Sequence, residues 1–177
     1  MFLCGYSKNR RPVVYLMFSK DKEYNHELNA KILLYSFERA IQSLPVHSQE
    51  FILVIDMNGF GWVNFPPMNT ISKMTSILGK HMPRRLGNVF MLNVSYIVNM
   101  AYDMVAMSLA EVTRSKFRFL SCDRTEIFNA LSEHIDAEEI PVEYGGTKTM
   151  SFDVAEYLAS DIYYTGDFNG GKPPLYA

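Results

Sequence analysis

The sequence predicts an α/β domain built on a mainly parallel β-sheet. Segments rich in β-branched and aromatic residues alternate along the chain with segments of helical apolar periodicity. Residues 51–55 are continuously apolar, which is typical of a strand buried on both faces of a parallel sheet. The length of 177 residues suits one such domain, expected over 1–160, followed by a loosely ordered tail rich in glycine and proline over 161–177.

The first half of the chain predicts two strands, each followed by a helix. Residues 12–18 are dense in β-branched and aromatic side chains and predict the first strand. Apolar residues then recur at helical spacing over 27–44, and Pro45 ends that helix. After the strand at 51–55, two prolines open a second helix over 66–79.

The second half repeats the alternation. Residues 89–92 and 116–120 predict strands, and residues 95–109 predict the helix between them. A final helix over 124–134 begins with a capping box formed by Asp123 and Glu126. Strands that alternate with helices in this way are joined by right-handed crossovers in a parallel sheet.

Composition excludes several classes of protein. The formal net charge of −2 gives no electrostatic basis for nucleic-acid binding. The two cysteines, Cys4 and Cys122, are far apart and predict neither a disulfide framework nor a structural zinc site. No histidine is paired with another histidine or a cysteine at the spacing of metal ligands, and we expect no metal or other cofactor. The apolar runs are far shorter than the roughly 20 residues of a membrane span, and the beginning lacks the apolar core of a signal peptide. These features favour a reducing, cytoplasmic setting.

Catalytic motifs are mostly missing. The sequence contains no GxxxxGK[ST] phosphate loop, no GxGxxG after a strand and no GxSxG elbow. Asp56 follows the buried strand at the end where open α/β sheets usually bind ligands, but an aspartate that caps its own turn is an equally good interpretation. Because no nucleophile and base can be paired, we do not expect an enzyme.

Two further patterns allow a structural and a functional interpretation. In the predicted helix 95–109 an apolar stripe contains Ile97, Met100 or Ala101, Met104 and Met107, which fits plain core or a pliable ligand-facing helix. Basic residues precede two neighbouring strands, which fits either a solvated surface or an anion site; they are Arg84, Arg85, Arg114, Lys116 and Arg118.

The chain resembles the CRAL-TRIO lipid-binding family, the Sec-fourteen-like phospholipid transfer proteins, from Gly5 to Gly146. The resemblance lies in the order and spacing of short motifs, each weak alone. They are Arg11-Pro-Val-Val-Tyr15, Phe37-Glu-Arg-Ala40, Ile55-Asp56, Met82-Pro-Arg-Arg-Leu-Gly87, Val89-Phe-Met-Leu-Asn93, Val112-Thr-Arg-Ser-Lys116 and Ile140-Pro-Val-Glu-Tyr-Gly-Gly146.

The resemblance implies a sheet that forms the floor of an apolar lipid pocket under a mobile gate helix. The implied pocket residues are Phe51, Leu53, Ile55, Met91 and Tyr96. The implied gate covers 97–109 and includes Ile97, Met100, Ala101, Met104, Val105 and Met107. Gly145 and Gly146 would form the hinge, because glycine permits backbone conformations that a Cβ would oppose. The family's usual helical subdomain has no room ahead of Gly5.

The resemblance also implies a headgroup site at Arg84, Arg85, Thr113 and Lys116. Members that bind phosphatidylinositol have a glutamate where this chain has Arg84, and this reversal of charge favours phosphate or carboxylate over inositol hydroxyls. Phe51 and Leu53 replace small hydroxyl residues of members that bind phosphatidylcholine, which suits a sterol or another small hydrophobe.

The expected function is therefore the non-enzymatic binding of a lipid and its transfer between membranes. The ligand would be phosphatidylinositol, another phospholipid or a small hydrophobe such as a sterol, and the contact with membranes would be peripheral and transient. The alternative is a protein-interaction scaffold of the same fold, of the type that regulates small GTPases, with little lipid exchange.

Overall fold

The computed structural model describes residues 2–20, 25–81 and 84–150. For residues 2, 3, 20, 74, 77, 78, 80 and 81 it describes the backbone alone. The expected tail at 161–177 and the last ten residues of the expected domain lie outside the described residues.

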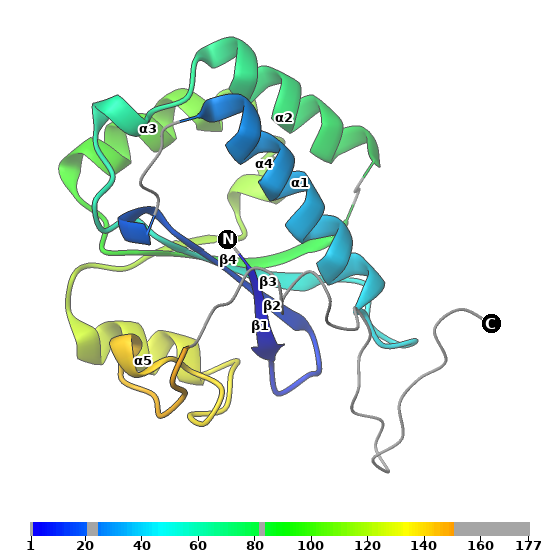
Figure 1. Cartoon of the computed structure of the whole chain (residues 1–177), viewed down its shortest axis with the longest axis vertical. Helices are drawn as coiled ribbons and strands as arrows, with labels where there is room; N and C mark the ends of the chain where they lie inside the picture. The colour runs from blue at the N-terminus through cyan, green and yellow to red at the C-terminus, as the bar shows by residue number, and fades with distance from the viewer. Residues whose placement is uncertain (1, 21–24, 82–83, 151–177) are drawn as a thin grey trace.

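The fold is α/β, as predicted, with a mostly parallel five-stranded sheet (Figure 1). The strands lie in sequence order in the sheet: β1 (Phe2–Tyr6), β2 (Pro12–Met17), β3 (Phe51–Asp56), β4 (Leu86–Leu92) and β5 (Phe117–Phe119). Strands β2 to β5 are parallel, whereas β1 is antiparallel to β2. The carboxyl ends of the parallel strands meet at one edge of the sheet and their amino ends at the other.

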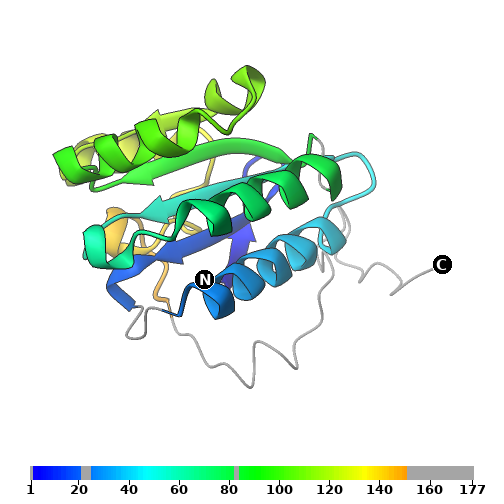
Figure 2. The same ribbon diagram turned by 90° about the horizontal axis from the view of Figure 1, so that it is seen from above.

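Helices cover both faces of the sheet. One face, called here the upper face from its place in Figure 1, carries α1 (His26–Gln42), α2 (Met68–His81), α3 (Tyr96–Ala106) and the short α4 (Glu111–Arg114). Figure 2 shows α1, α2 and α3 running across this face. The lower face carries α5 (Arg124–Ser132) and the 3₁₀ turn η3 (Val142–Tyr144). Two other 3₁₀ turns, η1 (Phe18–Lys20) and η2 (Trp62–Asn64), follow β2 and β3.

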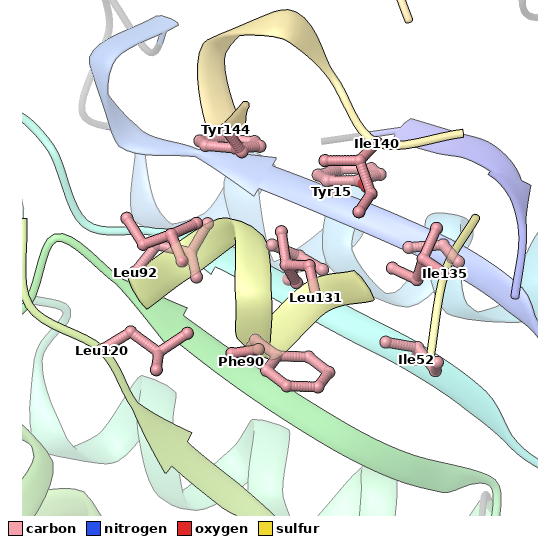
Figure 3. Packing of buried hydrophobic residues seen from close by; sticks show 13 residues of the cluster. Tyr15, Ile52, Phe90, Leu92, Leu120, Leu131, Ile135, Ile140 and Tyr144 are labelled. Atoms are coloured by element: carbon pink, nitrogen blue, oxygen red, sulfur yellow. The ribbon is translucent and has the colours of Figure 1, made fainter. Parts of the chain in front are cut away.

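The lower face carries a closed hydrophobic core. Large side chains of the sheet, including Tyr15 and Phe90, pack against Leu131 of α5 and are almost completely excluded from solvent (Figure 3). The ring of Tyr144 stacks on that of Tyr15 with centroids 6.2 Å apart. Burial of this kind is worth about 1.5–3 kcal/mol for each large apolar side chain, so this face contributes strongly to the stability of the domain.

The upper face is less completely closed. Its core contains Phe51, Leu53 and Met91 of the sheet, but many of the apolar side chains packed against it are only partly buried. Tyr102 of α3 is one of these, and its ring lies against Phe117 and Phe119 of β5, with centroids 5.1 and 4.7 Å apart.

Side-chain caps explain where several helices begin. Asn25 accepts a hydrogen bond from Leu28 N at the start of α1, and Ser95 accepts one from Val98 N at the start of α3. Asp123 caps α5 as predicted, but the expected capping box is wrong in its second half. A capping box requires the carboxylate of Glu126 to accept a hydrogen bond from the N–H of Asp123. Here that carboxylate accepts hydrogen bonds from the backbone N–H and the hydroxyl of Ser121 instead.

Candidate ligand-binding site

A cavity of about 670 Å³ lies at the amino edge of the sheet, and we call it the cationic cavity. The segments that lead into β2, β3, β4 and β5 meet there because these strands are parallel. Its lining consists of Asn9, Arg10, Arg11, Pro45, His47, Ser48, Gln49, Glu50, Arg84, Val112 and Lys116.

Positive charge dominates this lining. Four arginine and lysine side chains face a single carboxylate, that of Glu50. The two oxygens of Glu50 are shared between two of them: Arg11 Nη2 lies 3.3 Å from Oε2, and Lys116 Nζ lies 3.2 Å from Oε1. Lys116 also donates a hydrogen bond to the carbonyl of Leu86. Glu50 therefore orients Arg11 and Lys116 but balances only part of the positive charge.

The structure brings two of the four expected headgroup residues to this cavity. Arg84 and Lys116 both belong to its lining, although they lie 32 residues apart in sequence. Arg85 and Thr113 do not line it: Arg85 Nη1 lies 3.4 Å from the carbonyl of Gln49, and Thr113 lies in α4 beside the lining residue Val112. A headgroup role for all four stays a prediction.

Sequence reasoning missed three basic lining residues, Arg10, Arg11 and His47. The available signal was the position of Arg10 and Arg11 directly before β2, which matches that of Arg84 and Arg85 before β4. Arg118 does not join the cavity, because it lies in β5 and its guanidinium contacts Glu133 at 2.7 Å.

The expected lipid-pocket residues separate into two groups. Phe51, Leu53 and Met91 lie in the core of the upper face, and Ile55 packs at its margin. Tyr96 lies outside that core, at the start of α3, with 77% of its surface exposed.

The expected gate helix corresponds to α3 and the turn after it. The structure buries Val98 and Ala101 against the sheet, with Ile97 and Val105 half-buried. Tyr96 and three methionines are exposed on the opposite side, the methionines by 42, 37 and 80% of their surface. We call these four residues, Tyr96, Met100, Met104 and Met107, the outer apolar strip. Their role in a gate stays a prediction.

The expected hinge lies on the other side of the sheet from α3. Gly145 has a φ of +93° and packs against Phe128 of α5. A Cβ on Gly146 would lie 2.0 Å from the carbonyl oxygen of Ile140. Both glycines are thus required by the tight turn after η3, and a hinge function stays a prediction.

Asp56 lies at the carboxyl edge, in a smaller cavity of about 290 Å³ that Cys122 and Arg124 also line. Its carboxylate accepts hydrogen bonds from Asn58 N at 2.9 Å, Asn93 Nδ2 at 2.6 Å and the Tyr144 hydroxyl at 2.9 Å. Burial, followed by the charge of Asp56, raises the pKa of Tyr144. These contacts give Asp56 a structural role in its own turn, which is one of the two interpretations of Asp56 that the sequence left open; the other was ligand binding.

Metal binding and membrane spanning find no support in the described residues. No group of three or more histidine, cysteine or acidic side chains is arranged to hold a metal ion in residues 2–20, 25–81 and 84–150. Within the same ranges, no helix has the length and hydropathy needed to cross a bilayer.

Comparison with known proteins gives consistent matches. The CRAL/TRIO domain family matches residues 1–146. A CRAL-TRIO domain-containing protein of Schizosaccharomyces pombe is 22% identical over 155 residues, which cover 88% of this chain and 15% of that protein. The phosphatidylinositol transfer protein SFH5 of Kluyveromyces lactis is 27% identical over 144 residues, which cover 77% of this chain and 46% of that protein.

A solved structure has the same fold. The crystal structure of Sfh5 superposes with a TM-score of 0.61 at 20% identity, over 73% of this chain and 49% of that one. The chain thus spans less than half of the length of each of these three relatives.

Proposed function

Because the chain belongs to the CRAL/TRIO domain family, we propose that it binds a lipid against the upper face of the sheet and transfers it between membranes. The partial closure of the upper face carries this proposal. Tyr102, Phe117 and Phe119 are large apolar side chains left half-buried there, whereas the lower face is closed. Acyl chains that pack on these rings would gain about 0.8 kcal/mol for each buried CH₂ group.

The proposed ligand is a phospholipid, with a sterol or another small hydrophobe as the second choice. The name of the Kluyveromyces relative, a phosphatidylinositol transfer protein, supports a phospholipid. The cationic cavity supports an anionic headgroup, since four basic side chains line it against one carboxylate. Phe51 and Leu53, in the core of the upper face, have no polar side-chain atoms that could bind a headgroup. A position for the headgroup at the edge of the sheet is therefore favoured.

We assign α3 the role of the gate. The outer apolar strip would enter the interfacial region of a bilayer, as exposed apolar faces of amphipathic helices do. Methionine suits this exchange of environment because its side chain is flexible and polarizable. Movement of α3 away from the sheet would separate Tyr102 from Phe117 and Phe119 of β5, and so open the upper face to the acyl chains.

Replacement of Met104 by aspartate tests this function. Transfer of a fluorescent phospholipid between donor and acceptor vesicles should fall to the background rate, because the charge opposes insertion of the strip. Asn99→Asp is the matched control, since it adds the same charge at an exposed position of α3 outside the strip. Both variants should keep the wild-type circular dichroism. Unchanged transfer by Met104→Asp would exclude α3 as the membrane-contacting gate.

A protein-interaction scaffold is the second candidate, favoured by the exposure of the outer apolar strip, which also suits a protein partner. Extraction of the purified protein with organic solvent and mass spectrometry of the extract distinguishes the two functions. One lipid per protein supports the carrier. A protein that carries no lipid, even after incubation with liposomes, supports the scaffold.

A further inference from the structure

We infer that the cavity of about 290 Å³ at the carboxyl edge of the sheet, called here the carboxyl-edge cavity, binds a small zwitterion. The ligand would carry one ammonium and one carboxylate group and would have about the size of a single amino acid. This site is separate from the cationic cavity, and the inference does not rest on lipid binding. The observations that carry it are the origin of the lining, the charges of three side chains and the hydrogen bonds of Asp56.

The lining of the carboxyl-edge cavity comes from the ends of all four parallel strands. Ser19 follows β2, Asp56 ends β3, Asn93 follows β4 and Cys122 follows β5. Open α/β sheets usually bind their ligands at this edge, where the loops that leave the parallel strands gather. The cavity is therefore a product of the whole sheet and not of a single turn.

Its size and polarity fit a small polar molecule. Met17 and Ile127 supply apolar surface, and residues with hydrogen-bonding side chains make up most of the rest of the lining. A volume of about 290 Å³ lies at the lower end of small-molecule sites. The acyl chains of a phospholipid need more space and a more apolar lining, so this cavity does not suit a whole lipid.

Two carboxylates and one guanidinium line the cavity: those of Asp56, Glu143 and Arg124. In the part of the chain that the structure describes, none of the three belongs to an ion pair. Arg124 instead donates a hydrogen bond to the carbonyl of Val142. The excess of negative charge disfavours a simple anion, whereas the guanidinium favours a ligand that also has a carboxylate. This set of charges is matched to a ligand that carries both signs.

The contacts that fix Asp56 in its turn leave one of its acceptor positions open. A carboxylate offers about four such positions, two on each oxygen. Oδ1 of Asp56 accepts two hydrogen bonds, from Asn58 N and Asn93 Nδ2, whereas Oδ2 accepts one, from the Tyr144 hydroxyl. Among the described residues no second donor reaches Oδ2. An ammonium group, which has three N–H donors, can fill this position.

Tyr144 reports the negative potential that an ammonium group would meet. Burial raises the pKa of Tyr144 most, and the charges of Asp56 and Glu143 raise it further. Both carboxylates thus act on the same hydroxyl, and both would stabilise a cation beside it. Because the phenol keeps its proton, its oxygen donates to Asp56 and can still accept a hydrogen bond from a ligand.

Several lining side chains are fixed before a ligand enters. Asn93 is held by its 2.6 Å hydrogen bond to Asp56, and Arg124 by the carbonyl of Val142. The ring of Tyr144 is stacked on that of Tyr15. A ligand that binds such a site loses less free energy to the ordering of side chains, so a small molecule with few contacts can still bind.

The test compares probes of similar size that differ in charge. L-norvaline and δ-aminovalerate are zwitterions that present their two charges at different spacings, L-norvalinamide has the ammonium alone, and pentanoate has the carboxylate alone. Their dissociation constants would be measured at neutral pH by NMR titration of the isotope-labelled full chain. We expect at least one zwitterion to bind about tenfold more tightly than both probes with a single charge. Equal binding of either single-charge probe, or no binding of any probe, would overturn the inference.

Two variants separate the roles of the charges. Arg124→Gln should weaken the zwitterion about tenfold and leave L-norvalinamide unchanged, whereas Glu143→Gln should weaken both. The matched controls are Arg114→Gln and Glu138→Gln, which change exposed residues of the same types outside the cavity. All four variants should keep the wild-type circular dichroism. Zwitterion affinity that is unchanged in both cavity variants, or lowered equally in the controls, would contradict the assignment.

The thiol of Cys122 locates the bound probe. Cys122 is a free, exposed cysteine that lines the cavity, whereas Cys4 lies in β1 outside it. Alkylation of each cysteine by iodoacetamide would be followed by mass spectrometry, with and without a saturating concentration of the tighter zwitterion. We expect the zwitterion to slow alkylation at Cys122 and to leave the rate at Cys4 unchanged. An unchanged rate at Cys122 would place the ligand elsewhere and overturn the inference.

Discussion

The hydroxyl of Tyr144 donates a 2.9 Å hydrogen bond to the carboxylate of Asp56, across 88 residues of sequence. Both side chains are buried. The same carboxylate accepts a hydrogen bond from Asn93, which lies two residues before the cap of α3. Asp56 therefore connects the end of β3 with the beginning of α3 on the upper face and with η3 on the lower face.

Removal of the Tyr144 hydroxyl should destabilise the fold. Tyr144→Phe leaves the buried Asp56 carboxylate without one of its donors, and we expect a loss of about 1–3 kcal/mol in the free energy of unfolding. Urea unfolding followed by circular dichroism measures this loss. Tyr96→Phe is the control, because that tyrosine is largely exposed and should change stability by less than about 0.5 kcal/mol. Equal midpoints for wild type and Tyr144→Phe would contradict a stabilising role for the bond.

Stability should also decline in alkaline solution. Burial raises the pKa of Tyr15 and of Tyr144, so above pH ~10 the unfolded chain releases phenol protons that the folded chain retains. These phenols contribute a constant stability below that pH. Above it, each lowers the free energy of unfolding by about 1.4 kcal/mol for each pH unit until its folded-state pKa is reached.

Urea unfolding at a series of pH values between about 9 and 11 checks this slope. Tyr144→Phe should reduce it by the equivalent of one proton, because one of the two buried phenols is gone. Identical slopes for the two proteins would show that Tyr144 titrates normally in the folded state.

The glycines of the chain should respond very differently to alanine. Gly146→Ala places a Cβ 2.0 Å from a backbone oxygen, which forces the turn after η3 to move, and we expect a loss of about 2 kcal/mol or more. Gly79→Ala is the comparison, since it lies inside α2 with nothing within 4 Å of the new Cβ. There alanine should raise stability by about 0.5–1 kcal/mol through its higher helix propensity. Thermal unfolding of both variants measures these changes in stability. A midpoint for Gly146→Ala equal to that of the wild type would refute the steric argument.

Loss of the side-chain cap of α5 should lower the free energy of unfolding by a smaller amount. Asp123 accepts hydrogen bonds from Thr125 N at 2.8 Å and Glu126 N at 3.4 Å. Asp123→Ala should cost about 1 kcal/mol, measured by urea unfolding, because these N–H groups lose their acceptor. Asp123→Asn keeps an acceptor at the same position and should retain most of the stability. A similar loss in both variants would mean that the charge of Asp123, and not its cap, stabilises the helix.

Most of the parallel sheet could be predicted from the sequence, because buried strands such as residues 51–55 and amphipathic helices such as 27–44 have strong and different periodicities. The strand β1 was missed. It has five residues, includes Gly5 at a φ of +80°, and pairs with β2 through an irregular register. A short edge strand of this kind carries no alternation long enough to detect.

The candidate site was predictable only where its residues belong to recognisable motifs. Arg84 and Lys116 come from motifs with an implied headgroup role. Arg11 belongs to a motif without such a role, and Arg10 and His47 reach the cationic cavity through tertiary structure. The orientation of α3 was not predictable either. Its apolar residues surround most of the helix, so periodicity does not reveal that the smaller Val98 and Ala101 face the sheet while the methionines face outward.

In the sheet, each strand is hydrogen-bonded to the strand that precedes it in the chain. The nascent polypeptide can therefore add β2 to β5 one after another as it leaves the ribosome, without threading or waiting for a distant partner. The covering of the lower face does not follow this order, because α5 and η3 are synthesised after all five strands. Until α5 and η3 are made, Tyr15 and Phe90 stay exposed to solvent. The nascent domain is therefore most prone to aggregation during this interval.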